Sequence, residues 1–95
     1  MQTQSDAVSE KEFRVKSTTP APELGSAIAH AINAGHVVVL KPVGAGAVNQ
    51  SVKAIPIAQS FVSSFGTRLT EEISFFRSKS PQGDILGIAI RVMGS

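Results

Sequence analysis

Hydrophobic and polar positions alternate in some segments of this chain and recur at helical spacing in others. In the segment Lys11–Ser17, Phe13 and Val15 face one way while Arg14 and Lys16 face the other. This alternation predicts a short, half-buried strand.

A helix and a second strand are predicted next. Leu24, Ile28 and Ile32 recur every four residues after a Thr-Thr-Pro start, which predicts a helix ending near Ala34. Gly35 is expected to end it as a left-handed cap. The following run, HVVVL at 36–40, is apolar and largely β-branched, as in a strand that is covered on both faces or central in its sheet. Pro42 fits the end of that strand, because proline cannot donate a ladder hydrogen bond.

A second helix is predicted from Ala47. Two neighbouring apolar stripes give it a broad face that we expect to be buried; they contain Val48, Val52, Ile55 and Val62, and Ile57, Phe61 and Phe65. Pro56 removes a backbone donor within this helix, so we expect a kink there or an early end.

The last third of the chain is predicted to form a β-hairpin. The segment 67–79 alternates with Leu69, Ile73 and Phe75 on one face, SPQGD is a turn, and ILGIAIRVM (85–93) is the returning strand. The predicted order is therefore βαβαββ. The expected core contains Val38, Leu40, Val52, Ile55, Ile88 and Ile90.

Composition narrows the class of protein. Ninety-five residues, 42% hydrophobic and 17% charged, indicate one globular domain, expected at 11–95 behind a flexible arm at 1–10. The polar N-terminus does not resemble a signal peptide and no apolar run is long enough to cross a membrane, so we expect a cytoplasmic protein without a membrane partner. The net charge of +2 and the pI of about 9.4 permit contact with a polyanion.

The stretch GAGAVNQSVKAIPIAQSFV, residues 44–62, resembles the signature of the stage V sporulation protein S family. More distantly, the chain is similar to the Alba superfamily of small βαβαββ proteins that form dimers and bind DNA or RNA. The resemblance implies an α+β two-layer fold with a four-stranded mixed sheet and two helices on one face. It also implies a role in spore development.

Several residues are candidates for contacts to nucleic acid. Arg77 and Lys79 stand before the hairpin turn, where Alba proteins carry their minor-groove arms. Asn49 and Lys53 lie one helical turn apart, and Arg14 and Lys16 form another same-face pair, which is alternatively a protected strand edge. The amides that follow Gly44 and Gly46 can hold a phosphate, although these glycines equally suit a tight turn and close helix packing.

No catalytic or cofactor machinery is visible in the sequence. The chain has no Cys, and His30 and His36 have no acidic neighbour at ligand spacing, so neither a metal site nor a cofactor is expected. Glu71 and Glu72 are adjacent in a strand and point to opposite faces, which excludes a paired-carboxylate acid and base. We therefore expect neither an enzyme nor a small-molecule substrate.

Two hypotheses for the function stay open. The first is a nucleic-acid-binding homodimer or higher oligomer with a regulatory or chromosome-associated role, favoured by the basic hairpin. The second is a self-assembling protein-interaction module. It is favoured because Ala45 and Gln50 stand where Alba proteins have basic residues. Phe61, Phe65, Phe75 and Phe76 are the candidate contacts between copies in either case.

Overall fold

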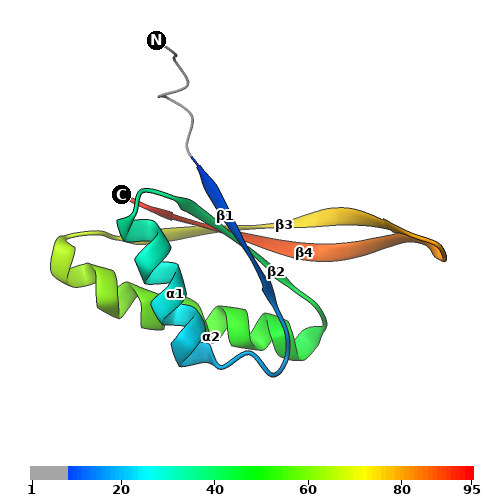
Figure 1. Ribbon diagram of the computed structural model, residues 1–95, viewed down its shortest axis with the longest axis horizontal. Coiled ribbons are helices and arrows are strands. Elements are labelled where there is room, and N and C mark those ends of the chain that lie inside the picture. Colours follow the sequence, from blue (N-terminus) through cyan, green and yellow to red (C-terminus); the bar gives the residue numbers. More distant parts are fainter. Residues whose placement is uncertain (1–8) are drawn as a thin grey trace, which may run out of the picture.

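The computed structural model describes residues 9–95 (Figure 1). Its elements are β1 (Glu10–Val15), α1 (Ala21–Asn33), β2 (Val37–Pro42), α2 (Ala45–Val62), a short 3-10 helix η2 (Ser63–Phe65), β3 (Leu69–Ser80) and β4 (Gly83–Gly94). The predicted βαβαββ order is confirmed. Within the expected N-terminal arm, Glu10 begins β1 and the carbonyl of Ser9 accepts a hydrogen bond from the amide of Val37, whereas residues 1–8 lie outside the described part of the chain.

The four strands form one mixed sheet in the order β1-β2-β4-β3. Strands β1 and β2 are parallel, and β4 is antiparallel to both of its neighbours. Burial alternates along β2, since Val38 and Leu40 are fully buried while Val37 and Val39 are half-buried. The buried side chains face the two helices, so the expected two-layer fold with both helices on one face is confirmed.

Local interactions set the ends of the first strand and helix. Strand β1 ends at Val15, two residues earlier than predicted, because the amide of Thr19 bonds back to the carbonyl of Lys16 and closes a turn. Pro20 then precedes α1 as its N-cap residue. At the other end Gly35 has φ +93°, the left-handed conformation that was expected of it.

The buried face of α2 differs from the prediction. Its buried residues are small, apart from the last: Ala47, Ser51, Ala54, Ala58 and Val62. Val52, which was expected in the core, is 50% exposed, and Phe61 and Phe65 are exposed as well. The physical reason is the close approach of α1, since small side chains let two helices pack more tightly than a row of Val and Ile would.

Either a kink or an early end was expected at Pro56; α2 runs through Pro56 to Val62, so the early end does not occur. Pro56 lies on the exposed side of the helix, as does Val52, whose carbonyl loses its intrahelical donor. Water can satisfy a carbonyl on that side, and this makes the proline tolerable.

The rest of the core prediction is largely confirmed. Val38, Leu40 and Ile90 are buried, and Ile55 and Ile88 are partly buried and pack against the same cluster.

Strands β3 and β4 extend beyond the body as a two-stranded hairpin (Figure 1). Strand β2 pairs with β4 only from Val38 to Leu40, opposite Ile90 to Val92. The β4 residues 83–89 therefore pair with β3 alone. We call the segment 74–89 the hairpin arm.

Candidate nucleic-acid interface

The hairpin arm carries the two basic residues that the sequence singled out. Arg77 lies opposite Leu86 and Lys79 opposite Asp84, and all four are exposed. Side chains alternate along a strand, so Arg77 and Lys79 share the face of Leu69, which is buried beneath the helices. No ion pair joins Lys79 to Asp84, which leaves both cations available to solvent.

The glycine turn before α2 is held by close packing. Gly44 is the N-cap residue with φ +92°, a conformation that side chains rarely adopt. A Cβ on Gly46 would lie 2.8 Å from Cβ of Ser17, so the β1–α1 turn rests directly on the start of α2. The side chain of Gln50 ties the two together by donating from Nε2 to the carbonyl of Thr19 at 2.8 Å. This structural role of Gln50 was not predicted from the sequence.

The same turn leaves backbone donors at the start of α2. The first intrahelical bond runs from the amide of Val48 to the carbonyl of Gly44, so the amides of residues 45–47 have no partner within the helix. No acidic side chain stands in this first turn. These amides are compatible with a phosphate oxygen as well as with water.

Asn49 and Lys53 lie together on the outer side of α2. Both are exposed, and the buried positions Ala47, Ser51 and Ala54 are on the opposite side of the helix. Asn49 does not cap the helix, because the N-cap residue is Gly44 and no side-chain cap is formed. The two side chains therefore face solvent one turn apart.

Arg14 and Lys16 are exposed but do not form one site. Arg14 lies on the sheet face that carries no helix, next to Lys41 in the register of β1 and β2. Lys16 stands in the turn beyond the strand. On the open face Lys41 Nζ is 3.2 Å from Glu12 Oε1 and 4.9 Å from the centre of the Phe76 ring, and Arg91 pairs with Glu10. These partners of Lys41 were not foreseen, since they come from strands far apart in sequence.

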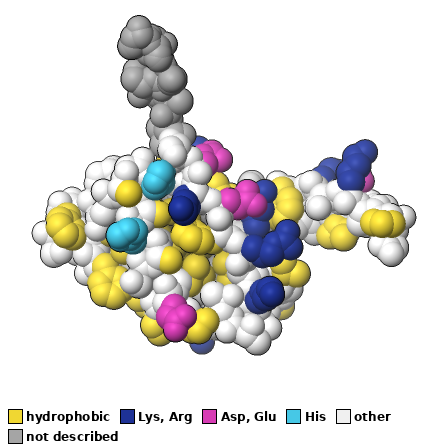
Figure 2. All heavy atoms as spheres, in the orientation of Figure 1, with side chains coloured by type: hydrophobic (Ala, Val, Ile, Leu, Met, Phe, Trp, Pro, Cys, Tyr) yellow, Lys and Arg dark blue, Asp and Glu magenta, His cyan; other side chains and the backbone are white. Residues whose placement is uncertain are grey.

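The structure brings some of these candidates together and separates others. Gly44 and Ala45 share a hollow with Leu86 and Ile88, so the glycine turn adjoins the base of the hairpin arm. Figure 2 shows Lys and Arg side chains gathered on the body near the point where the arm leaves it, and others on the arm. Arg14 lies on the opposite face of the sheet from Arg77 and Lys79.

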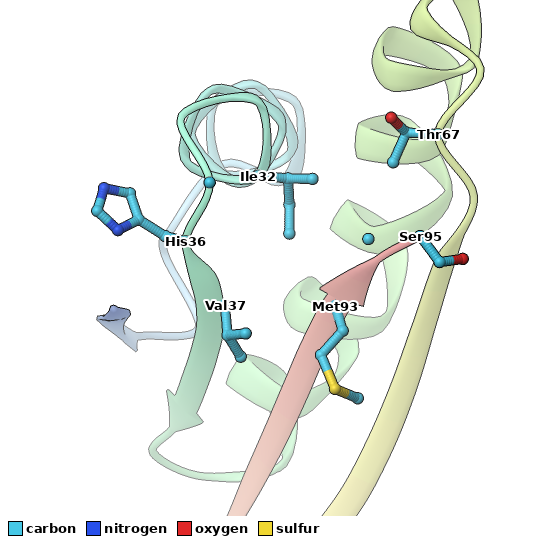
Figure 3. A pocket seen from close by; sticks show the side chains of 8 residues that line it. Ile32, His36, Val37, Thr67, Met93 and Ser95 are labelled. Atoms are coloured by element: carbon cyan, nitrogen blue, oxygen red, sulfur yellow. The ribbon is translucent and has the colours of Figure 1, made fainter. Parts of the chain in front are cut away.

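A second hollow lies where β2 begins and β4 ends (Figure 3). It is lined mainly by Ile32, Val37, Thr67 and Met93, and the ring of His36 points away from it. Nδ1 of His36 is instead hydrogen-bonded to Oγ of Ser9 at 2.9 Å. Within residues 9–95, no group of three or more His, Cys, Asp or Glu side chains is arranged to hold a metal ion.

Comparison of the chain with models of protein families shows which family it belongs to. The model of the family described as stage V sporulation protein S (SpoVS) matches residues 11–93. The chain belongs to the SpoVS family. The match spans all the strands and helices described above except the terminal residues Glu10 of β1 and Gly94 of β4, and it includes the glycine turn and the hairpin arm.

The SpoVS fold is similar to that of Alba from Thermoplasma volcanium. The two share 15% sequence identity with a TM-score of 0.52, over 90% of this chain and 99% of the Alba chain. This likeness shows the Alba-like fold. No curated protein sequence matches the chain. None of the helices in the described residues is long and apolar enough to cross a membrane.

Proposed function

We propose that this SpoVS-family protein is a homodimer that binds DNA or RNA without sequence specificity and acts in sporulation or a related developmental process. The observation that carries the proposal is the hairpin arm, which projects from the body and presents Arg77 and Lys79 on one face. Seven residues of extended strand reach about 20 Å, enough to follow a nucleic-acid groove.

We expect this binding to be carried by contacts to phosphates and not by contacts to bases. Lys53 and the free amides of residues 45–47 offer further donors, and contacts to the phosphate backbone carry no sequence information. The chain has no Trp or Tyr, and the ring of Phe76 is covered by Lys41. Phe75 is then the one exposed ring of the hairpin arm, and a single ring does not stack successive bases, so an aromatic platform for single strands is not part of the proposal.

Exposed apolar side chains support the oligomer. Among residues 9–95, eight large hydrophobic residues are at least half exposed: Val43, Val52, Phe61, Phe65, Ile73, Phe75, Ile85 and Leu86. Three of the four expected Phe contacts are among them, whereas Phe76 is half-buried. Such surface is typical of an interaction site. A monomer in sedimentation at about 100 μM would contradict the oligomer, because ordinary interfaces form well below that concentration.

A mobility-shift assay with short duplex DNA and RNA at low salt tests nucleic-acid binding. The Arg77→Ala, Lys79→Ala double variant should lose most of its binding and keep its fold. The double variant Lys11→Ala, Arg68→Ala is the matched control, because it removes the same charge from exposed sites outside the arm. Equal losses in the two variants would show that the arm has no special role.

A self-assembling interaction module without nucleic acid is the second candidate. The same exposed apolar residues favour it, together with a net charge of only +2. An oligomer that shows no shift with either nucleic acid near 50 mM salt, where phosphate contacts are strongest, would make this candidate the better account.

A further inference from the structure

Strand β3 is a free edge of the sheet, and its pattern of charges is self-complementary. It pairs with β4 on one side only, so its other side offers unpaired backbone donors and acceptors. The opposite edge, β1, is six residues long with charged Lys11, Glu12 and Arg14, whereas β3 is twelve residues long with apolar residues at its centre. A long edge with apolar residues at its centre and complementary charges on either side is a template for another strand.

We propose that the β3 edges of two copies pair antiparallel, with Ser74 on the two-fold axis, so that the sheet continues across the dimer. In this register Glu71 lies opposite Arg77 of the second copy, and Ile73 lies opposite Phe75, each pair occurring twice. This inference rests on the homodimer of the proposed function and specifies its interface.

The charges favour this register over its neighbours. A two-fold axis at Glu71 or at Glu72 would place that carboxylate against its own copy, which is destabilising. An axis at Ile73 would set Glu71 against Phe75, and an axis at Phe75 would set Ile73 against Arg77. An axis at Phe75 would also place Glu71 opposite Lys79, but among these registers the axis at Ser74 alone pairs both Glu71 with a cation and Ile73 with an apolar side chain.

Glu71 and Arg77 cannot form an ion pair with each other within one chain. Both are exposed and on the same face of β3, but six residues of extended strand separate them by about 20 Å. Neither takes part in an ion pair among the residues that the structure describes. Across the two-fold axis the same two side chains become direct neighbours.

A hollow beside the edge fits the partner's aromatic ring. It is lined by Val52, Ile55 and Pro56 of α2 and by Glu71, Ile73 and Ile90 of the sheet. The side chain opposite Ile73 in the proposed register is Phe75 of the second copy, which is 72% exposed in the single chain. It lies on the helix-facing side and would bury its ring against these residues, as an anchor at the centre of an interface does. This contact also accounts for the exposed position of Val52.

The pairing leaves the arm able to bind phosphate. Lys79 falls opposite Leu69 of the second copy, so its charge stays unpaired while its stem covers an apolar neighbour. Arg77 has five N–H donors and can keep some of them free beside a carboxylate.

Sedimentation of charge-reversal variants tests the pairing without any nucleic acid. Glu71→Arg and Arg77→Glu should each raise the dimer Kd by on the order of a hundredfold, because each sets like charges opposite one another twice. The double variant should restore the dimer. Phe75→Ser should also dissociate it, whereas Phe65→Ser, equally exposed but in η2 beyond the end of α2, should not.

Disulfide trapping gives a second, independent readout, since the chain contains no Cys. Ser74→Cys places its thiol directly opposite its own copy, within the Cα separation of about 4.5–5.5 Å that a disulfide accepts. Ser78→Cys on the same face is the control, because its two copies would stand roughly 27 Å apart. Selective cross-linking of Ser74→Cys is the expected result.

The outcomes separate this inference from the proposed function. A stable dimer in which the charge reversals change nothing, and in which both or neither of the cysteine variants cross-link, would overturn the β3 register while leaving the dimer intact. A wild-type monomer would overturn both. Loss of the dimer without loss of nucleic-acid binding would show that binding does not need the second copy.

Discussion

Gly25 of α1 lies directly against Ile57 of α2. A Cβ added to Gly25 would stand 2.6 Å from Cγ2 of Ile57 and 3.0 Å from the carbonyl oxygen of Ala54. The second neighbour is backbone and cannot rotate away. The absence of a side chain at residue 25 therefore sets how closely the two helices pack.

Gly25→Ala should destabilise the protein in spite of the higher helix propensity of alanine. We expect the free energy of unfolding to fall by about 1–2 kcal/mol, since overpacking outweighs a propensity gain of about 1 kcal/mol. Urea denaturation measures this change. Ser26→Ala, at the next and exposed position, is the control and should stay within about 0.5 kcal/mol of the parent. A stabilised Gly25→Ala variant would show that the helices move apart at little cost.

Gly46→Ala should be destabilising for a related reason and should be rescued in part by Ser17→Gly. The Cβ of Ser17 is the nearest atom to the added methyl group, and Ser17→Gly removes it. A double-mutant cycle built from the free energies of unfolding, measured by urea denaturation, should give a coupling free energy of about 1 kcal/mol between the two sites. Strict additivity of the two changes would contradict the contact.

Gln59 links the end of α2 to the start of β3. Its Nε2 donates to the carbonyl of Thr67 at 3.0 Å, and its Oε1 accepts from the amide of Leu69 at 2.8 Å. Gln59→Leu should cost about 1–3 kcal/mol of stability, because these part-buried backbone groups lose their partners. Gln82→Leu at the hairpin turn should change the midpoint of thermal unfolding far less, since Gln82 is exposed.

Ser51→Ala should leave the protein as stable as the parent or more so. Ser51 is fully buried, and its Oγ has no hydrogen-bond partner within the described chain. Removing an unsatisfied buried hydroxyl is expected to raise the free energy of unfolding by about 1 kcal/mol. Ser60→Ala on the exposed side of the same helix is the control, since it makes the same change in propensity and also removes an exposed hydrogen bond from Oγ of Ser60 to the carbonyl of Ile57. A clear loss of stability in Ser51→Ala alone would indicate a partner for the hydroxyl.

Nucleic-acid binding should weaken steeply with salt. Each neutralised phosphate of duplex DNA contributes a slope of about 0.9 in a plot of log K against log salt. Lys79→Ala should therefore lower the slope by about one per protomer without changing the oligomeric state. Filter binding between 50 and 200 mM salt measures it. An unchanged slope would remove Lys79 from the interface.

Part of the fold followed from the sequence, because the signals were local. The alternation in β1 and β4, the glycine cap at Gly35 and the exclusion of Pro42 from the middle of β2 depend only on residues near them in the chain. Steric limits on φ and the loss of a backbone donor act in the same way in any fold. The family signature at 44–62 is likewise a property of the sequence.

The buried side of α2 was decided by tertiary structure. Hydrophobicity alone favoured Val52 and the Phe residues, yet the helix buries Ala47, Ala54 and Ala58 because α1 approaches closely at Gly25. The large side chains are left outside. No periodicity in the sequence distinguishes a stripe that faces the core from one that faces a partner.

The separation of the candidate site residues was also decided by tertiary structure. The sequence paired Arg14 with Lys16 and Arg77 with Lys79, but it did not show that β4 pairs with β2 only from Ile90 to Val92, which leaves Arg77 of β3 on the part of the hairpin that extends beyond the body. It likewise did not show that Lys41 meets Phe76. Strand order and register join residues that are far apart in the chain, so these contacts exist only once the whole sheet has formed.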